Sequence, residues 1–317
     1  MQVDLKPQQL FEYEGISPCP SDIDDFWDDS IKEMESLDFQ VELRRTLPWL
    51  KQAEAFELYF TGVGGERIFA KYLRPLNARK APVVFTFHGY PGKTDGWTKY
   101  LSYVSQGFCV AALDCRGQKG KSQDLGGITG STFQGHIIRG LDSETPKDLL
   151  FRKVFLDTAQ LVRIVEGFEE TDENRMYAVG ASQGGALALA CAALSPQIKK
   201  VSAMFPFLCD YKRVWEMDLA ERAYGELKDY FRHYDPRHER EDEMFLRLGY
   251  IDIQNLAKRI KAEVYMFTGL LDTVCPPSTQ FAAFNKIQSE KRAIFYPDFG
   301  HEELPDAAEI IMEWFLK

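Results

Sequence analysis

Two kinds of apolar pattern recur along the chain and predict its strands. Residues 56–61 and 67–73 alternate apolar and polar side chains on either side of a glycine-rich turn, which predicts two antiparallel edge strands. Unbroken apolar runs, which are typical of strands buried on both faces of a parallel sheet, occur at 83–87, 108–113, 176–179, 264–267 and 293–296.

Helical periodicity fills the intervals between these strands. Apolar residues recur at helical spacing in four segments, at 149–168, 184–194, 277–287 and 307–316. Because parallel strands need long crossover connections, this alternation predicts an α/β fold with a mostly parallel central sheet flanked by helices.

Two further segments do not fit this alternation. Residues 1–50 form an N-terminal extension, in which Ser21 and the acidic residues after it predict the start of a short helix that packs on the main body. Residues 210–252 are dense in charged and aromatic side chains and predict a helical insertion over the carboxyl edge of the sheet. No repeat or flexible linker divides the chain, so we expect a single domain over residues 1–317.

The charge balance narrows the classes of partner. The 317 residues include 48 acidic and 38 basic side chains, and the formal net charge is −10. Such a chain repels phosphate backbones and anionic lipid headgroups. No apolar run approaches the roughly 20 residues of a membrane span. We therefore expect neither nucleic acid nor a membrane as a partner.

The cysteines and the N-terminal residues indicate in which cellular compartment the protein is expected. The six cysteines are scattered and lack the paired spacing of zinc or redox sites. Residues 1–7 lack the basic start and apolar core of a secretory signal. We expect reduced cysteines in a cytoplasmic protein, although an even number of cysteines can also pair in a secreted chain.

A GxSxG motif at residues 180–184 is the sharpest chemical signal. It follows the predicted strand 176–179 and precedes a helix of small residues. In this context the glycines allow a tight turn that presents the Ser182 hydroxyl as a nucleophile. A passive serine at a glycine-rich helix start is the alternative, whereas a phosphate-binding loop would need a lysine that is absent here.

A serine nucleophile requires a base and a carboxylate that orients the base. His301 follows the last predicted strand and completes the chain order serine, acid, histidine; its alternative is an ordinary surface histidine. Asp272 follows strand 264–267, at the edge where catalytic groups of parallel sheets gather. Asp298 and Glu302 are rival acids, but their closeness to His301 in sequence favours helix capping or solvent exposure.

Negative charge on the attacked carbonyl needs donors that already point at it. The candidates are the backbone amide of Gln183, directly after the nucleophile, and that of Tyr90, in the loop after an early strand. Trp97 and Phe207 are candidates for bulky side chains that crowd the acyl pocket, and plain aromatic packing beside a cleft is the alternative for Tyr90 and Trp97.

Three ordered motifs resemble the signature of carbohydrate esterase family 7, which comprises acetyl xylan esterases and cephalosporin C deacetylases of the α/β-hydrolase superfamily. These motifs are the RGQ sequence at 116–118, the GxSxG sequence at 180–184 and the HE pair at 301–302. The likeness covers nearly the whole chain and extends through residues 87–90, 135–140, 205–208 and 272–279.

This resemblance implies an α/β-hydrolase fold and removal of O-acetyl groups from short xylo-oligosaccharides and cephalosporin C through an acetyl-serine intermediate. It implies action inside the cell, without a metal or other cofactor, by a homohexamer built as a trimer of dimers. Arg116, Gly117 and Gln118 would hold the active-site loop. A broader short-chain carboxylesterase, a serine peptidase and a non-catalytic hydrolase-like binding protein are the rival hypotheses, since fold does not fix function.

Overall fold

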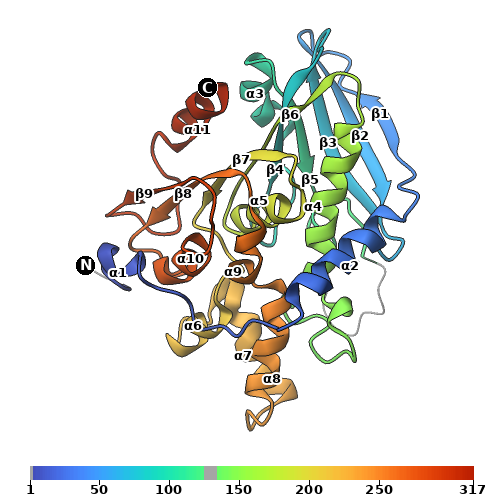
Figure 1. Cartoon of the computed structure of the whole chain (residues 1–317). Coiled ribbons are helices and arrows are strands. Elements are labelled where there is room, and N and C mark those ends of the chain that lie inside the picture. Colours follow the sequence, from blue (N-terminus) through green and yellow to red (C-terminus); the bar gives the residue numbers. More distant parts are fainter. Residues whose placement is uncertain (1–2, 125–133) are drawn as a thin grey trace.

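A single sheet of nine strands organises the part of the chain that the computed structural model describes, residues 3–124 and 134–317 (Figure 1). Its strand order is β1-β2-β3-β5-β4-β6-β7-β8-β9. The strands are β1 (Glu42–Thr46), β2 (Ala53–Thr61), β3 (Arg67–Pro75), β4 (Ala81–Phe87), β5 (Cys109–Leu113), β6 (Thr171–Ala181), β7 (Ile198–Met204), β8 (Glu263–Gly269) and β9 (Lys291–Tyr296).

The sheet has a small antiparallel part and a larger parallel part. The pairings β1–β2, β2–β3 and β3–β5 are antiparallel, whereas every pairing from β5 through β4 to β9 is parallel. The predicted mostly parallel α/β sheet is therefore confirmed.

The sequence analysis missed strands β1 and β7, and it wrongly placed the antiparallel pair at the edge of the sheet. Strand β1 lies outside β2, so the pair predicted at 56–61 and 67–73 is antiparallel but does not form the edge. The sequence of β1 is ELRRT and most of its residues are exposed, so no apolar alternation marks it. Strand β7 begins with Ile198 and two lysines, which obscure the apolar run that follows.

The helices connect and cover these strands. They are α1 (Pro7–Leu10), α2 (Ile23–Glu35), α3 (Leu101–Ser105), α4 (Leu150–Glu166), α5 (Gln183–Leu194), α6 (Tyr211–Glu216), α7 (Gly225–Tyr234), α8 (Glu241–Leu248), α9 (Ile253–Leu256), α10 (Pro277–Phe284) and α11 (Ala307–Leu316). The four crossover segments expected from helical spacing correspond to α4, α5, α10 and α11. No helix of the described residues has the length and apolar content that a membrane span requires.

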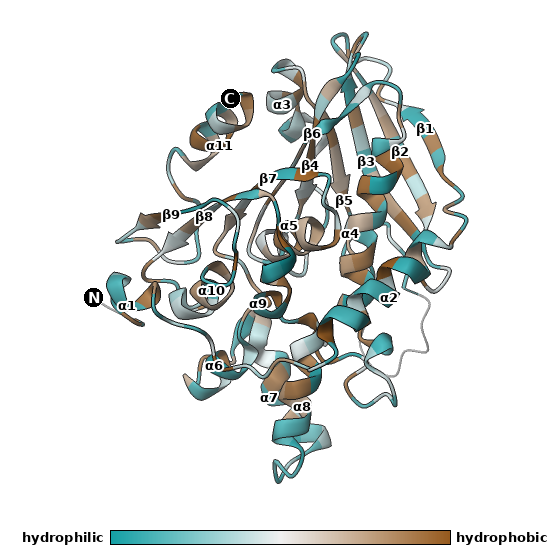
Figure 2. Cartoon of the chain, in the orientation of Figure 1, coloured by the Kyte–Doolittle hydropathy of each residue, from teal (hydrophilic) through white to brown (hydrophobic). Residues whose placement is uncertain are grey.

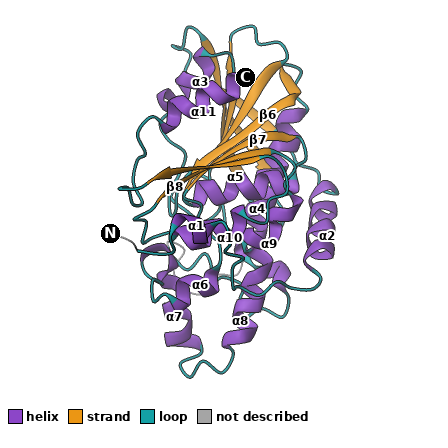
Figure 3. Cartoon of the chain, turned by 60° about the vertical axis from the view of Figure 1, so that its left-hand side comes forward, coloured by secondary structure: helices purple, strands orange, loops and turns teal. Residues whose placement is uncertain are grey.

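Apolar side chains of the central strands point alternately to two separate cores. In β4, Val83 and Phe85 pack in the core on the side of α4 and α5, whereas Val84 packs with Trp314 and Phe315 of α11. This alternation explains the unbroken apolar runs, because helices cover both faces of the sheet. Figure 3 shows α3 and α11 on one side of the strands and α4, α5 and α10 on the other.

Helix α5 lies in the centre of the molecule, and all of its residues are buried. Its sequence, QGGALALACAAL, consists mainly of small side chains, which let it lie close to strands β6 and β7 and to helix α4. In Figure 2 the central strands are coloured toward the hydrophobic end of the scale, whereas most of the visible ribbon of α2 is hydrophilic.

The predicted insertion is helical, and its two ends meet. Helices α6, α7 and α8 lie within residues 210–252, and Asp252 Oδ1 accepts a hydrogen bond of 3.0 Å from the amide of Asp210. The N-terminal extension packs on this point, since Tyr13 Oη and the Ser17 amide each donate to the Asp210 carboxylate at 2.8 Å.

Candidate active site

Ser182 occupies the sharp turn between β6 and α5, with φ 56° and ψ −122°. This conformation is strained for a residue with a side chain. Two glycines make the turn possible. A Cβ on Gly184 would lie 2.1 Å from the Phe87 carbonyl oxygen, and a Cβ on Gly180 would lie 2.3 Å from the backbone of Gly184. The GxSxG spacing is therefore a steric requirement of this turn.

Backbone hydrogen bonds hold the turn in place. The Ser182 amide donates to the Met204 carbonyl at 3.0 Å, and the Ser182 carbonyl accepts from the Phe207 amide at 3.0 Å. Because both partners come from the end of β7 and the segment after it, the strained residue is fixed to the neighbouring strand. Ser182 is partly exposed, although the helix that follows it is buried.

Asp272 and His301 come together from two different loops at the same edge of the sheet. Asp272 Oδ2 lies 2.8 Å from His301 Nδ1. The other oxygen of Asp272 accepts hydrogen bonds of 2.8 Å from the amides of Val274 and Cys275. With one oxygen committed to the loop, the other is aimed at the imidazole, and the second ring nitrogen, Nε2, remains available for chemistry.

The rival acids make other contacts. Glu302 Oε1 accepts a hydrogen bond of 3.0 Å from the Gly300 amide, and Asp298 is exposed to solvent. Of the three carboxyl groups considered, Asp272 is the one that contacts the imidazole of His301.

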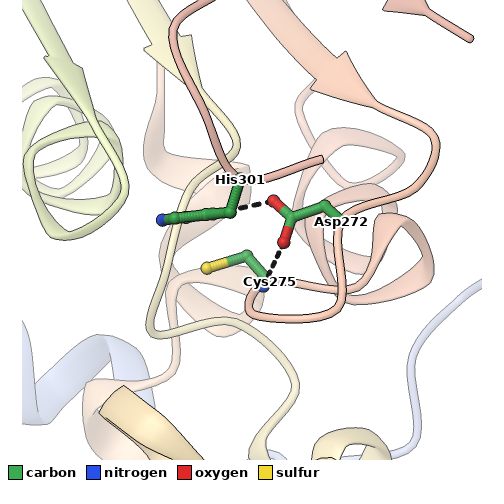
Figure 4. Close-up of side chains that lie close together, drawn as sticks. All are labelled: Asp272, Cys275 and His301. Carbon is green, nitrogen blue, oxygen red and sulfur yellow. Dashed lines mark hydrogen bonds and ion pairs between the residues drawn. The ribbon is translucent and has the colours of Figure 1, made fainter. Parts of the chain in front are cut away.

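A thiol that the sequence did not single out lies beside this pair. Ligand atoms of Asp272, Cys275 and His301 lie within 4.8 Å of one another (Figure 4). Burial, followed by the charge of Asp272, raises the pKa of the Cys275 thiol well above its usual value, while a hydrogen bond with Ser182 acts in the opposite direction. The only signal in the sequence was its position three residues after Asp272.

These three side chains fit proton transfer better than metal binding. Asp272 and His301 Nδ1 already satisfy each other, and a neutral thiol would have to lose its proton before it could bind a metal ion. The other ring nitrogen of His301, Nε2, could provide one metal ligand, whereas stable zinc sites use three or four.

Ser182 Oγ makes no hydrogen bond to His301 among the described residues, although the two side chains are linked through Cys275. Catalytic hydrogen bonds are often long in unliganded enzymes and shorten when substrate binds.

The two candidate oxyanion donors are free to bind a ligand. In the described chain, neither the Tyr90 amide nor the Gln183 amide donates to a protein acceptor. Gln183 is the first residue of α5, where backbone N–H groups have no partner within the helix and the helix dipole favours negative charge.

Gln118 connects the two segments that carry these amides. Its Nε2 donates to the Gln183 Oε1 at 2.7 Å, and its Oε1 accepts from the Gly92 amide at 3.1 Å. The Gln183 side chain in turn donates to the His88 carbonyl at 3.2 Å. The two amides thus belong to one hydrogen-bonded unit.

Arg116 is fully buried and contacts no part of the Ser182 turn. Its guanidinium makes two hydrogen bonds of 2.6 Å to Asp157, one of 2.6 Å to Glu66 and one of 2.8 Å to the Val63 carbonyl. These partners belong to the β2–β3 turn and to α4. Gly117, the next residue, has φ 64°, a conformation that favours glycine.

The two aromatic candidates for the acyl pocket, Phe207 and Trp97, lie in different parts of the structure. The Phe207 ring lies 5.9 Å from that of Tyr90 and 4.3 Å from that of Tyr224, beside the candidate oxyanion loop. Trp97 instead packs in a different cluster, where the Lys71 ammonium lies 5.0 Å from its ring. The structure therefore brings Phe207, and not Trp97, into contact with Tyr90.

His88 directly follows β4 near the site, and both of its ring nitrogens contact backbone groups. Its Nε2 accepts from the Cys115 amide at 3.0 Å, and its Nδ1 lies 2.9 Å from the Gly89 carbonyl. These partners require a neutral ring, and burial lowers the pKa of His88 accordingly. Glu226 and His136 are further buried polar residues near Tyr90. No motif or spacing in the sequence distinguishes Glu226 from the other acidic residues around it.

Known proteins resemble this chain along its whole length. A sequence profile of the acetyl xylan esterase family matches residues 1–317. An acetyl esterase from Xylanibacter ruminicola is 26% identical over 326 residues, which span 100% of this chain and 71% of that protein.

Two solved structures share the fold closely. Acetyl xylan esterase 1 from Thermoanaerobacterium sp. JW/SL YS485 has 53% identity and a TM-score of 0.96, with 99% of this chain and 98% of that chain covered. An acetyl xylan esterase from Paenibacillus sp. R4 has 33% identity and a TM-score of 0.90, with 98% and 99% covered.

Proposed function

The chain belongs to the acetyl xylan esterase family, and from this premise we propose that Ser182, Asp272 and His301 are its catalytic triad. As a member of this family it is a carboxylic ester hydrolase that removes acetyl groups. The observation that carries the triad is the 2.8 Å hydrogen bond between Asp272 and His301, at the sheet edge where β6 presents Ser182.

In the first half-reaction, His301 Nε2 takes the proton of Ser182 Oγ as the oxygen attacks the acetyl carbonyl carbon. Asp272 fixes the proton on Nδ1 and stabilises the imidazolium that forms. The tetrahedral intermediate then collapses. Its bond to the sugar oxygen breaks, Nε2 protonates that oxygen, and the acetyl group remains on Ser182.

In the second half-reaction, a water molecule attacks the acetyl-serine ester. His301 Nε2 accepts the water proton and then returns it to Ser182 Oγ as acetate leaves. In both halves the carbonyl oxygen becomes negative, and the amides of Tyr90 and Gln183 are its donors. Loss of one such donor costs about 10²–10³-fold in turnover in serine hydrolases.

The substrates we propose are O-acetylated xylo-oligosaccharides and cephalosporin C, as the family resemblance implies. An acetyl ester places only a methyl group in the acyl pocket. Phe207 is fully buried and its ring lies 5.9 Å from that of Tyr90, so we assign it support of the oxyanion loop and no direct contact with the acyl group. We assign Trp97 no substrate contact.

We also propose that the protein forms a homohexamer, a trimer of dimers, and acts in the cytoplasm. All six cysteines are free of disulfides, as suits a reducing compartment. Light scattering coupled to size-exclusion chromatography tests the assembly, since a hexamer has six times the chain mass of 36.4 kDa. A monomer or dimer would contradict it.

Two experiments test the activity. The Ser182→Ala variant should remain folded by circular dichroism and release no acetate, and retained turnover would refute the assignment of the nucleophile. A panel of acetyl, butyryl and octanoyl esters with a peptide anilide separates the deacetylase from a broader carboxylesterase or a peptidase. Fast cleavage of the octanoyl ester or the anilide would overturn the proposed substrate class.

A further inference from the structure

Glu226, a buried carboxyl group of helix α7, contacts the side chain of Tyr90. A hydrogen bond joins Glu226 Oε1 to Tyr90 Oη, and His136 Nδ1 lies 2.9 Å from the same phenol oxygen. We call Tyr90, His136 and Glu226 the Tyr90 cluster. Its members come from the loop after β4, from the segment before α4 and from the insertion.

The Tyr90 cluster is also tied to the surrounding backbone. Glu226 Oε2 accepts a hydrogen bond of 2.7 Å from the Ile137 amide, and His136 Nε2 lies 3.2 Å from the carbonyl oxygen of Gly117. Both contacts are buried or nearly so. The cluster therefore links the loop that carries a candidate oxyanion donor to the RGQ segment and to the insertion.

The contacts constrain where the protons lie. A carbonyl only accepts, so His136 Nε2 carries a proton that it donates to Gly117. Two arrangements with the same number of protons then satisfy the hydrogen bonds of the Tyr90 cluster. In one, Glu226 is protonated and His136 is neutral; in the other, Glu226 is a carboxylate and His136 is an imidazolium. Burial raises the pKa of Glu226, whereas hydrogen bonds from Tyr90 and from the amides of residues 135–137 act in the opposite direction. In both arrangements Tyr90 Oη is hydrogen-bonded to Glu226 and to His136.

Ring packing holds the Tyr90 side chain between the same elements. Its ring lies edge-on to His136 at 5.4 Å and 5.9 Å from Phe207, and Phe207 packs on Tyr224 at 4.3 Å. The rotamer of Tyr90 is thus fixed at its tip by hydrogen bonds and along its ring by contacts. Because the phenol and the backbone amide belong to one residue, fixing the first restrains the second.

We propose that Glu226 is a positioning residue that orients the Tyr90 amide toward the oxyanion through the Tyr90 phenol. The helical insertion is then part of the catalytic machinery as well as a cover for the sheet edge. This inference rests on the proposed function, because the Tyr90 amide matters only if a carbonyl oxygen acquires negative charge there. A displaced donor weakens transition-state binding more than ground-state binding.

Three variants test the role of Glu226 in the full-length protein. Glu226→Ala removes the contact, and Tyr90→Phe removes the phenol but keeps the amide. For each we expect kcat to fall about 10- to 100-fold, with KM for an acetyl ester changed less than about threefold. Glu226→Gln keeps an acceptor for the Ile137 amide and a second group that can bond Tyr90 Oη, and should keep kcat within about threefold.

Asp235→Ala is the matched control. Asp235 is a buried acid of the same insertion that accepts hydrogen bonds from the amides of Glu239 and Arg240 at 3.0 and 2.9 Å. It makes no contact with Tyr90, so its loss should lower the unfolding midpoint and leave kcat per titrated active site unchanged. Rates are normalised by active-site titration, which removes the effect of partial unfolding.

A second readout is the affinity for methylboronic acid, which forms a tetrahedral adduct on an active-site serine. Its inhibition constant should rise in Glu226→Ala and Tyr90→Phe by the same factor by which kcat/KM falls, and the double variant should be no worse than the poorer single one. A residue with only a structural role would leave this affinity unchanged per titrated site.

The outcomes separate this inference from the proposed function. If Ser182→Ala still releases acetate, the proposed function fails. If Ser182→Ala is inactive while Glu226→Ala and Tyr90→Phe keep wild-type kcat and boronate affinity, only the role of Glu226 is overturned. Should Glu226→Ala not fold, Tyr90→Phe alone decides, because wild-type turnover in that variant overturns the inference.

Discussion

His301 Nδ1 lies 2.8 Å from Asp272 Oδ2, and the two residues are 29 positions apart in the chain. The pair is asymmetric in its exposure. The Asp272 side chain is fully buried, whereas the His301 side chain is 21% exposed. The carboxylate is thus protected and fixed by the loop amides, while part of the imidazole is exposed to solvent.

Asp272→Asn should lower kcat by about 10⁴-fold. The asparagine Oδ1 can still accept from the loop amides, which turns its NH₂ group toward His301 Nδ1. The proton of the neutral ring then moves to Nε2, where it prevents His301 from accepting the Ser182 proton. Steady-state kinetics with an acetyl ester and urea unfolding check the change, and Glu302→Gln is the control with near-normal turnover. Wild-type turnover in Asp272→Asn would exclude Asp272 as the orienting acid.

Gly184→Ala should prevent formation of the Ser182 turn, because the added Cβ would lie 2.1 Å from the Phe87 carbonyl oxygen. We expect a loss of at least about 3 kcal/mol in the free energy of unfolding. Gly96→Ala is the matched control, since a Cβ at Gly96 meets no atom within 4 Å. Urea unfolding of both variants measures the difference, and equal stability would contradict the steric argument.

Arg116→Lys should destabilise the fold by about 3–5 kcal/mol, because it leaves buried carboxylate oxygens of Asp157 and Glu66 without a hydrogen-bond donor. A lysine ammonium offers three donors from one atom and cannot reproduce the planar, two-sided contact of the guanidinium. Arg175→Lys is the control. Arg175 pairs with Asp172 at the surface, and half of the Arg175 side chain is exposed. There we expect a change within about 0.5 kcal/mol in urea unfolding. A similar small change at Arg116 would refute the structural role.

Asp252 should make stability depend on pH. Burial, followed by the charge of Asp210, raises the pKa of Asp252 to about 6 in the folded protein, compared with about 3.9 in the unfolded chain. Between these values the folded state binds more protons, so this carboxyl group stabilises the fold below about pH 4 and its contribution is lost as the pH rises to about 6. The change amounts to about 3 kcal/mol.

The comparison of wild type with Asp252→Asn isolates this effect. Urea unfolding of both proteins between pH 4 and 7 gives a stability difference that should shift in favour of the variant by about 3 kcal/mol as the pH rises. The asparagine keeps one acceptor for the Asp210 amide and does not titrate. A difference that stays constant over this range would show that Asp252 titrates normally in the folded state.

Local patterns in the sequence determined the class of fold and the type of chemistry. Apolar runs of four to six residues identify strands covered on both faces. The small residues of α5 predict a helix packed against the sheet, because burial imposes these patterns residue by residue. The GxSxG spacing around Ser182 is equally local, since both glycines are required by contacts within one turn or with the adjacent strand. Strand β1 left no such signal because most of it faces solvent.

The tertiary structure alone decided which distant side chains meet. It selected Asp272 over Asp298 and Glu302 as the partner of His301, brought Cys275 beside them, and placed Trp97 in another cluster. It also joined Glu226 to Tyr90 across 136 positions of the chain. Sequence periodicity reports whether a position is buried but not against what, because contacts between segments depend on the order and register of the strands, which the chain fixes only when it folds.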